Sequence, residues 1–179
     1  MKKEIRFSGF GGQGIVLMGY IMGKALALSE GLEAVMTQSY GPEARGGASS
    51  SDIVVSDEPI AYPFVQKPDI LVAMSQEAYS KFREVAATGA TVLTDADLVS
   101  PKKPDAVQAI PATRLAEELG RRIVANVIML GFMTSATGIA ERASLEEAIR
   151  STVKEKTLPL NMEAFNIGYE YAQQKEPAS

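Results

Sequence analysis

The chain has 179 residues, of which 46% are hydrophobic and 22% charged, so its length and composition predict one globular domain spanning 1–179, with an ordered core over about 4–173. The net charge is −4 and Lys and Arg occur together only in short pairs. Because nucleic-acid binding requires clustered cations, no nucleic-acid partner is expected. Cysteine and histidine are both absent, which excludes disulfides, thiolate-ligated iron–sulfur clusters and the commonest general base, and the sequence indicates no metal site and no catalytic residue.

The first part of the chain alternates between strand and helix patterns. Residues 4–8 predict a strand, and the mostly apolar run 14–28 predicts a helix that is covered on both sides. Gly31 is expected to follow the end of that helix, and residues 33–38 predict a second strand.

The same alternation continues to the C-terminus. Strands are expected over 51–55, 69–74, 91–94 and 105–110, and helices over 76–87, 113–119, 124–135, 145–153 and 161–173. Strands that alternate with helices predict a Rossmann-like α/β single domain with a mostly parallel sheet and helices on both faces.

One uncharged stretch, 123–140, reaches the lower length limit of a membrane span. Its polar residues, including Asn126 and Thr134, favour a buried helix in a soluble core instead. The N-terminal residues lack the uninterrupted apolar region of a signal peptide, so a cytoplasmic protein with no membrane partner is expected.

A glycine-rich segment joins the first expected strand to the first expected helix and satisfies the pattern G-x-G-x-x-G. Such a turn lets a ligand approach the backbone amides at a helix N-terminus, which is an anion-binding geometry. The alternative is a glycine turn that only lets the helix pack tightly on the sheet. A dinucleotide site would also need an acid at the end of the strand over 33–38, and none is present. The candidate cofactor-binding residues here are Gly9, Gly11, Gly12, Gln13 and Gly14.

The loop after the second expected strand carries a single cation, Arg45, followed by two glycines. In a parallel sheet this loop lies on the same rim as the glycine-rich segment, so Arg45 is a sixth candidate for ligand binding. Two alternatives stay open for Arg45: it pairs with a carboxylate of a partner chain, or it lies in a solvated surface loop.

Two other features leave alternatives open. Asn126 lies among apolar residues and must find hydrogen-bond partners, either in neighbouring backbone or in a ligand. The aromatic, proline-containing segment 60–64 is either an anchor for a protein interface or a cap on the core.

The segments "GFGGQGIVLMGYIMGKA" and "TQSYGPEARGGASSSDIVVSD", in this order, resemble the gamma subunit of 2-oxoacid:ferredoxin oxidoreductases. The later segments "PDILVAMSQEAYSKF", "ANVIMLGFM" and "NMEAFNIGYEYA" extend the resemblance from Ile5 to about Ala172. The form "YGPEARGG" is most similar to the 2-oxoglutarate branch, and the pyruvate and branched-chain 2-oxoacid branches are close relatives.

The resemblance implies a non-autonomous subunit of an enzyme that oxidatively decarboxylates a 2-oxoacid with coenzyme A, giving an acyl-CoA, carbon dioxide and reduced ferredoxin. It implies alpha and beta subunits as partners, with a delta subunit as a further candidate, and ferredoxin as an indirect partner. Thiamine diphosphate and the iron–sulfur clusters would belong to those partners, and this chain would bind no cofactor alone. The glycine-rich segment would face coenzyme A or, alternatively, a subunit interface.

Two rival functions are considered. One is the beta subunit of indolepyruvate:ferredoxin oxidoreductase, which the resemblance implies has the same fold and glycine loop. The other is a stand-alone nucleotide-binding regulatory module, which would be a monomer that binds nucleotide unaided.

Overall fold

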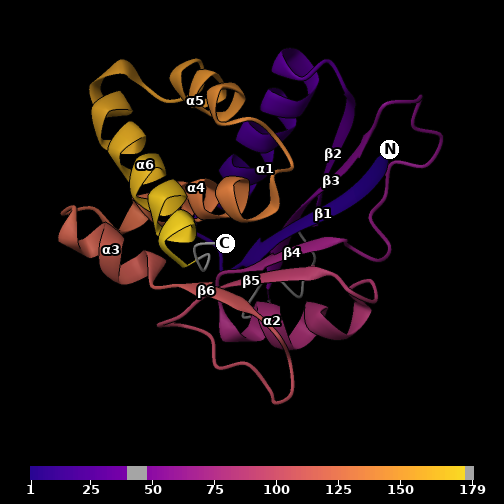
Figure 1. Cartoon of the computed structure of the whole chain (residues 1–179), viewed down its shortest axis with the longest axis horizontal. Helices are drawn as coiled ribbons and strands as arrows, with labels where there is room; N and C mark the ends of the chain where they lie inside the picture. Colours follow the sequence, from indigo (N-terminus) through magenta and orange to yellow (C-terminus); the bar gives the residue numbers. More distant parts are fainter. Residues whose placement is uncertain (40–47, 176–179) are drawn as a thin grey trace.

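The computed structural model of the protein describes residues 1–39 and 48–175. Its centre is a six-stranded sheet with the strand order β2-β3-β1-β4-β5-β6 (Figure 1). The strands are β1 (Lys2–Gly9), β2 (Glu33–Ser39), β3 (Ser49–Ser56), β4 (Ile70–Ala73), β5 (Thr91–Asp95) and β6 (Gln108–Ile110).

The sheet is mixed, and β3 is the strand that is antiparallel to its neighbours. β1, β4, β5 and β6 pair in parallel, whereas β3 pairs antiparallel with both β1 and β2. Only residues 40–48 separate β2 from β3, and parallel neighbours need a crossover of a dozen or more residues. The expected mostly parallel sheet is therefore confirmed, with this antiparallel insertion as the difference.

Helices cover both faces of the sheet, as expected, but unequally in the described residues. α2 lies on one face, while α1, α4, α5 and α6 lie on the other (Figure 1). The helices are α1 (Ile15–Lys24), α2 (Gln76–Phe82), α3 (Ala112–Glu118), α4 (Ala125–Thr137), α5 (Arg142–Arg150) and α6 (Leu158–Lys175). A π-helical turn, Ala25–Ser29, extends α1, and short 3-10 turns follow α2 (Arg83–Val85) and precede α4 (Arg122–Val124) and α6 (Glu155–Thr157).

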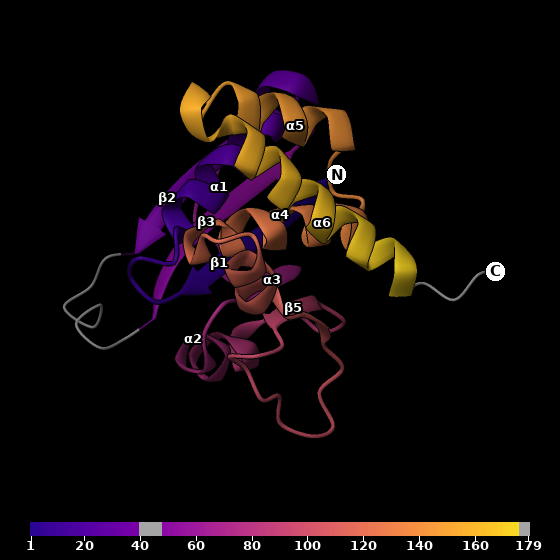
Figure 2. The same cartoon turned by 90° about the vertical axis from the view of Figure 1, so that its left-hand side faces the viewer.

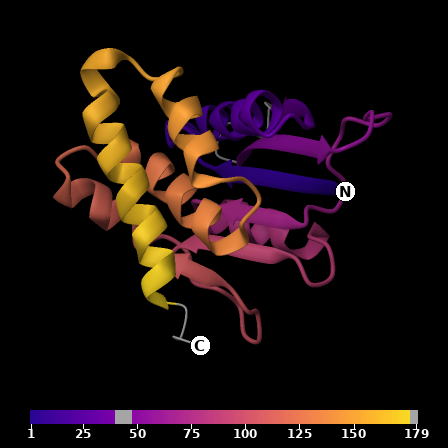
Figure 3. The same ribbon diagram turned by 45° about the horizontal axis from the view of Figure 1, so that its top comes forward.

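The larger core lies between the sheet and the layer formed by α1, α4, α5 and α6. Ile5 and Phe7 of β1 and Ile53 of β3 face this layer and are fully buried. α6 lies across the outer side of α4 (Figures 2 and 3). A smaller core lies under α2, around Tyr79 and Phe82.

The buried helix expected over 124–135 is confirmed as α4. Its first ten residues, Ala125 to Thr134, are all buried in the core. Among the described residues, no helix combines the length and the apolar character needed to cross a bilayer.

Several boundaries differ from expectation. The helix expected over 145–153 is α5, which begins and ends three residues earlier. The helix expected over 76–87 is shorter, since α2 ends at Phe82 and continues only as a 3-10 turn. The strand expected over 105–110 begins at Gln108, because Asp105 lies in a loop where its side chain bonds to α2. α6 begins three residues earlier than expected, since Pro159 fits the first turn of a helix.

Candidate functional site

The glycine loop, residues 9–14, connects the end of β1 to the start of α1. Gly12 and Gly14 have φ values of 87° and 75°, a left-handed region that glycine adopts without strain. Gly14 is the N-cap of α1 in this conformation. The chain therefore needs glycine at these two positions to turn directly from the sheet into the helix.

The loop presents backbone amides at an uncapped helix N-terminus. Gly11 and Gly12 are exposed, and within the described residues the N–H groups of Gly11, Gly12 and Gly14 have no hydrogen-bond acceptor. No side chain of the described residues caps α1, and its first turn carries no acid, whereas Ser75 caps α2 by accepting from the Ala78 N–H at 3.2 Å. Unpaired amides at the positive end of a helix dipole favour an anion such as a phosphate.

A pocket of about 200 Å³ opens beside this loop. It lies where the carboxyl ends of β1 and β4 meet, and the strand order reverses there, which is the usual ligand position in open α/β sheets. Its lining comes from the glycine loop, the end of β4, the start of α3 and the α3–α4 connection: Gly12, Gln13, Met74, Thr113, Arg122, Ile123 and Ala125.

Arg122 brings a cation to this pocket that the glycine pattern alone does not predict. Its side chain is 66% exposed and its Nη1 lies 3.7 Å from Glu117 Oε1. An exposed ion pair of this kind contributes little to stability. The guanidinium can therefore turn to an anion at the loop. In the sequence, Arg122 was considered only as a member of a short basic pair. Its position directly before the long buried helix was the one feature that could have indicated a site residue.

The predicted site residues fall into different environments. Gly11 and Gly12 are exposed, whereas Gly9 is buried, and a Cβ there would lie 2.4 Å from Gln13 Oε1. Close packing is thus sufficient reason for glycine at position 9. Arg45 lies outside the described residues.

Of the two alternatives for the Asn126 side chain, backbone or ligand, the structure shows hydrogen bonds to backbone. The side chain is buried, its Nδ2 donates to the Gly14 carbonyl at 3.3 Å, and its Oδ1 accepts from the Val127 N–H at 2.8 Å.

The strand arrangement argues against a dinucleotide site. β1 pairs in parallel with β4 on one side and antiparallel with β3 on the other, which brings Ser49 to the rim, and Ser49 Oγ donates to the Gly9 carbonyl at 3.1 Å. On the side of β1 where a dinucleotide fold places the parallel strand that carries the ribose-binding acid, this sheet has the antiparallel β3 instead.

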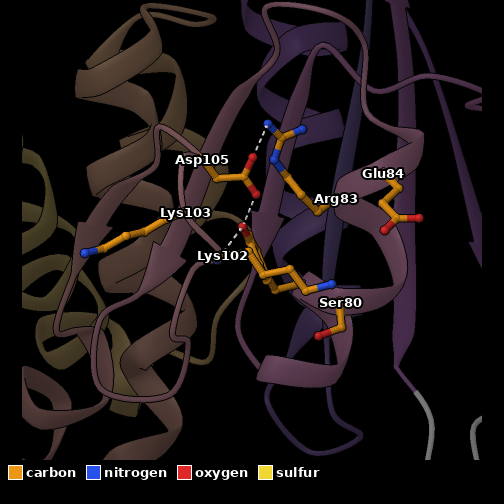
Figure 4. Close-up of a pocket in the computed structure, with 7 residues that line it drawn as sticks. Ser80, Arg83, Glu84, Lys102, Lys103 and Asp105 are labelled. Carbon is orange, nitrogen blue, oxygen red and sulfur yellow. Dashed lines mark hydrogen bonds and ion pairs between the residues drawn. The ribbon is translucent and has the colours of Figure 1, made fainter.

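A second pocket, of about 300 Å³, lies on the α2 side of the sheet (Figure 4). There the Asp105 carboxylate accepts from the Tyr79 hydroxyl and from Arg83 Nη2, the latter at 3.0 Å. These contacts hold the pKa of Asp105 below its ordinary 3.8, whereas burial and the bond to Asp105 raise the pKa of Tyr79. Because the charges of Arg83 and Asp105 already pair with each other here, we take the glycine loop as the candidate site.

In the described part of the chain, no group of three or more Asp, Glu, His or Cys side chains is arranged to hold a metal ion.

Comparison with known proteins gives a family match across nearly the whole chain. Residues 4–171 match the family described as pyruvate ferredoxin/flavodoxin oxidoreductase. The chain is 54% identical to the 2-oxoglutarate synthase subunit KorC of Methanocaldococcus jannaschii, over 97% of this chain and 96% of that protein.

Two solved structures share the fold. The gamma subunit of a keto/oxoacid ferredoxin oxidoreductase from Geobacter sulfurreducens is 41% identical, with a TM-score of 0.87 over 96% of this chain and 99% of that chain. A 2-oxoglutarate:ferredoxin oxidoreductase from Magnetococcus marinus, with 2-oxoglutarate, coenzyme A and succinyl-CoA bound, is 25% identical with a TM-score of 0.86. That alignment covers 99% of this chain but 32% of the Magnetococcus chain.

Proposed function

Because this chain belongs to the pyruvate ferredoxin/flavodoxin oxidoreductase family, we propose that it is the gamma subunit of a 2-oxoglutarate:ferredoxin oxidoreductase. The assembled enzyme would convert 2-oxoglutarate and coenzyme A to succinyl-CoA and carbon dioxide, with ferredoxin as the electron acceptor. The observation that carries this proposal is the 54% identity to a 2-oxoglutarate synthase subunit over nearly the full length of both chains.

The partners in this proposal are the alpha and beta subunits, with a delta subunit as a further candidate. The Magnetococcus chain supports this assignment, since a domain similar to the present chain makes up only 32% of it. A separate polypeptide resembling the remainder is then the expected partner. The iron–sulfur clusters are assigned to partner subunits because the 179 residues contain no cysteine to ligate them. Thiamine diphosphate is assigned to the partners because the family resemblance implies it.

In this proposal the glycine loop contributes to coenzyme A binding. The amides of Gly11 and Gly12 and the N-terminus of α1 would contact a phosphate of coenzyme A, and Arg122 would supply a positive charge from the opposite wall of the pocket. Ile123, half exposed in the same wall, offers apolar surface to the less polar part of the ligand. The chain thus binds and orients coenzyme A, whose thiol reacts at a centre on a partner subunit.

Titration of the assembled enzyme with coenzyme A tests the contact. Gly12→Val disturbs a left-handed position in the loop, and Arg122→Ala removes the charge. Each is expected to weaken coenzyme A binding about tenfold, equivalent to about 1.4 kcal/mol. Gly31→Val and Arg121→Ala are matched controls, since Gly31 has a similar φ of 67° in a remote turn and Arg121 is the neighbouring exposed arginine. Unchanged affinity for coenzyme A in an intact complex would show that the loop and Arg122 do not contact coenzyme A.

Co-purification tests the assignment as a subunit. A tagged chain expressed in its native host is expected to bring down larger chains that carry thiamine diphosphate and iron–sulfur clusters, and to show no turnover alone. A monomer that binds nucleotide unaided would instead favour the regulatory module. Partners that act on indolepyruvate would favour the other oxidoreductase.

A further inference from the structure

The glycine loop is held from inside the fold by the amide groups of two side chains. The first is its own Gln13, whose Oε1 accepts from the Phe10 N–H at 2.6 Å while its Nε2 donates to the Met74 carbonyl at 2.8 Å. Both ends of this amide are therefore engaged, and the loop is tied to the end of β4.

The second side chain is Asn126, which reaches the other end of the loop from α4. Its Nδ2 donates to the Gly14 carbonyl, and that carbonyl also accepts from the Met18 N–H at 3.1 Å as the first hydrogen bond of α1. Only one orientation of the amide places a donor toward the Gly14 carbonyl and an acceptor toward the Val127 N–H. A Cβ on Gly14 would lie 2.2 Å from Nδ2, so glycine is needed here for contact as well as for φ.

Asn126 also lies next to the opposite wall of the pocket. Ala125, which precedes it, lines the pocket together with Arg122 and Ile123 of the same segment. The hydrogen bond from Asn126 to Gly14 thus joins two walls whose residues are 112 positions apart in the chain. A shift of α4 would move the Arg122 guanidinium relative to the amides of the loop.

We infer that Asn126 is a positioning residue that fixes the distance between the glycine loop and the Arg122 wall, so that one anion can contact both. The inference rests on the proposed function for the identity of that anion, coenzyme A. The hydrogen bond itself is independent of the ligand, so the two can be tested separately.

Asn126→Asp is the informative variant because it preserves shape and replaces the Nδ2 donor with an oxygen that faces the Gly14 carbonyl. Asn126→Ser is a second variant, since its short side chain cannot reach Gly14 and introduces no charge. Asn161→Asp is the matched control: Asn161 is also buried, and its Nδ2 donates to a backbone carbonyl, that of Thr157, at 2.9 Å within α6 and its preceding turn.

The experiment measures hydrogen exchange of the two hydrogen-bonded loop amides, those of Phe10 and Gln13, and steady-state kinetics in the assembled enzyme. For either Asn126 variant we expect about tenfold faster exchange in the loop. The KM for coenzyme A should rise several-fold, with KM for 2-oxoglutarate and kcat at saturating coenzyme A unchanged. Asn161→Asp should leave both the loop exchange and the KM for coenzyme A unaltered.

Two results separate this inference from the proposed function. Wild-type exchange in the loop of both Asn126 variants, within an assembled complex, would overturn the positioning role. Faster loop exchange with an unchanged KM for coenzyme A would uphold the positioning of the loop and count against its contact with coenzyme A.

Discussion

The side chains of Tyr79, Arg83 and Asp105 form a cluster whose protonation depends on the fold. The Tyr79 hydroxyl and the Arg83 guanidinium both donate to the Asp105 carboxylate, and together they lower the pKa of Asp105. Burial, and then the hydrogen bond to Asp105, raise the pKa of Tyr79 above its ordinary 10.0. The cluster links α2 to the loop between β5 and β6.

This cluster predicts a pH-dependent contribution to stability. Because folding lowers the pKa of Asp105 below 3.8, the ionised carboxylate stabilises the native state above that pH. The stabilisation is lost as the pH falls through the lowered pKa. Asp105→Asn should therefore reduce the melting temperature most near neutral pH, with the difference from wild type closing in acid.

Melting temperatures of wild type, Asp105→Asn and Tyr79→Phe between about pH 7 and pH 3 check this prediction. Tyr79→Phe removes the hydroxyl donor, so it should bring the pKa of Asp105 back toward 3.8 and move the acid loss of stability to higher pH. A difference between wild type and Asp105→Asn that does not vary with pH would contradict it.

At the residue scale, the sequence indicated which positions need a particular backbone conformation more readily than it indicated what each side chain contacts. The glycine pattern identified Gly12 and Gly14, because a turn from strand to helix leaves few conformations for other residues. It did not indicate that the Gln13 side chain points inward, since its partner Met74 is 61 residues away. Arg122 was missed as a site residue for the same reason.

At the scale of elements, the crossing of α4 and α6 depends on two glycines. A Cβ on Gly131 would lie 2.1 Å from the Phe165 carbonyl oxygen, and one on Gly168 would lie 1.8 Å from the Ile128 carbonyl oxygen. These neighbours are backbone atoms, which cannot rotate away. The two helix axes can approach this closely only because both positions lack a side chain.

Gly131→Ala and Gly168→Ala should each destabilise the protein by about 1–3 kcal/mol or more, because the added methyl group must push the helices apart. Gly23→Ala is the control, since a Cβ there meets only Ile53 Cδ1 at an ordinary 3.8 Å. It should stabilise α1 by about 0.5–1 kcal/mol, the helix preference of alanine over glycine.

Urea unfolding of the purified chain measures these changes through the denaturation midpoint at constant slope. If Gly131→Ala and Gly168→Ala unfold at the wild-type midpoint, the close crossing of α4 and α6 is not as described.

Most elements could be predicted because their burial leaves a pattern in the sequence. The apolar run "ILVA" of β4 is buried on both faces, and it was predicted to within a residue at each end. The antiparallel direction of β3 carries no such pattern, since the same residues fit either direction. The start of β6 was misplaced because Asp105 bonds to α2 through its side chain, a contact across 22 to 26 residues.

At the scale of the whole molecule, an exposed aromatic pair separates the two alternatives left open for segment 60–64. Tyr62 and Phe64 are 50% and 55% exposed, and their rings meet edge to face with centroids 5.6 Å apart. A core cap would be buried beneath its neighbours, so the arrangement favours an interface anchor. Under the proposed function, a partner subunit is the expected occupant of this surface.

The double variant Tyr62→Ser/Phe64→Ser should therefore weaken assembly while leaving the isolated chain as stable as wild type. Large aromatic side chains dominate the free energy of many interfaces, and losing one such anchor costs about 2 kcal/mol or more, which is at least about a 30-fold loss of affinity. In the free chain both rings are already half in water, so their removal costs the fold little.

Leu28→Ser is the control, because Leu28 is 74% exposed at the far end of the π-helical turn and should affect neither property. Pull-down of the partner subunits, with melting of each variant alongside, distinguishes the outcomes. Full assembly by the double variant would show that these residues are not an interface anchor. A lowered melting temperature of the free chain would instead indicate that they cap the core.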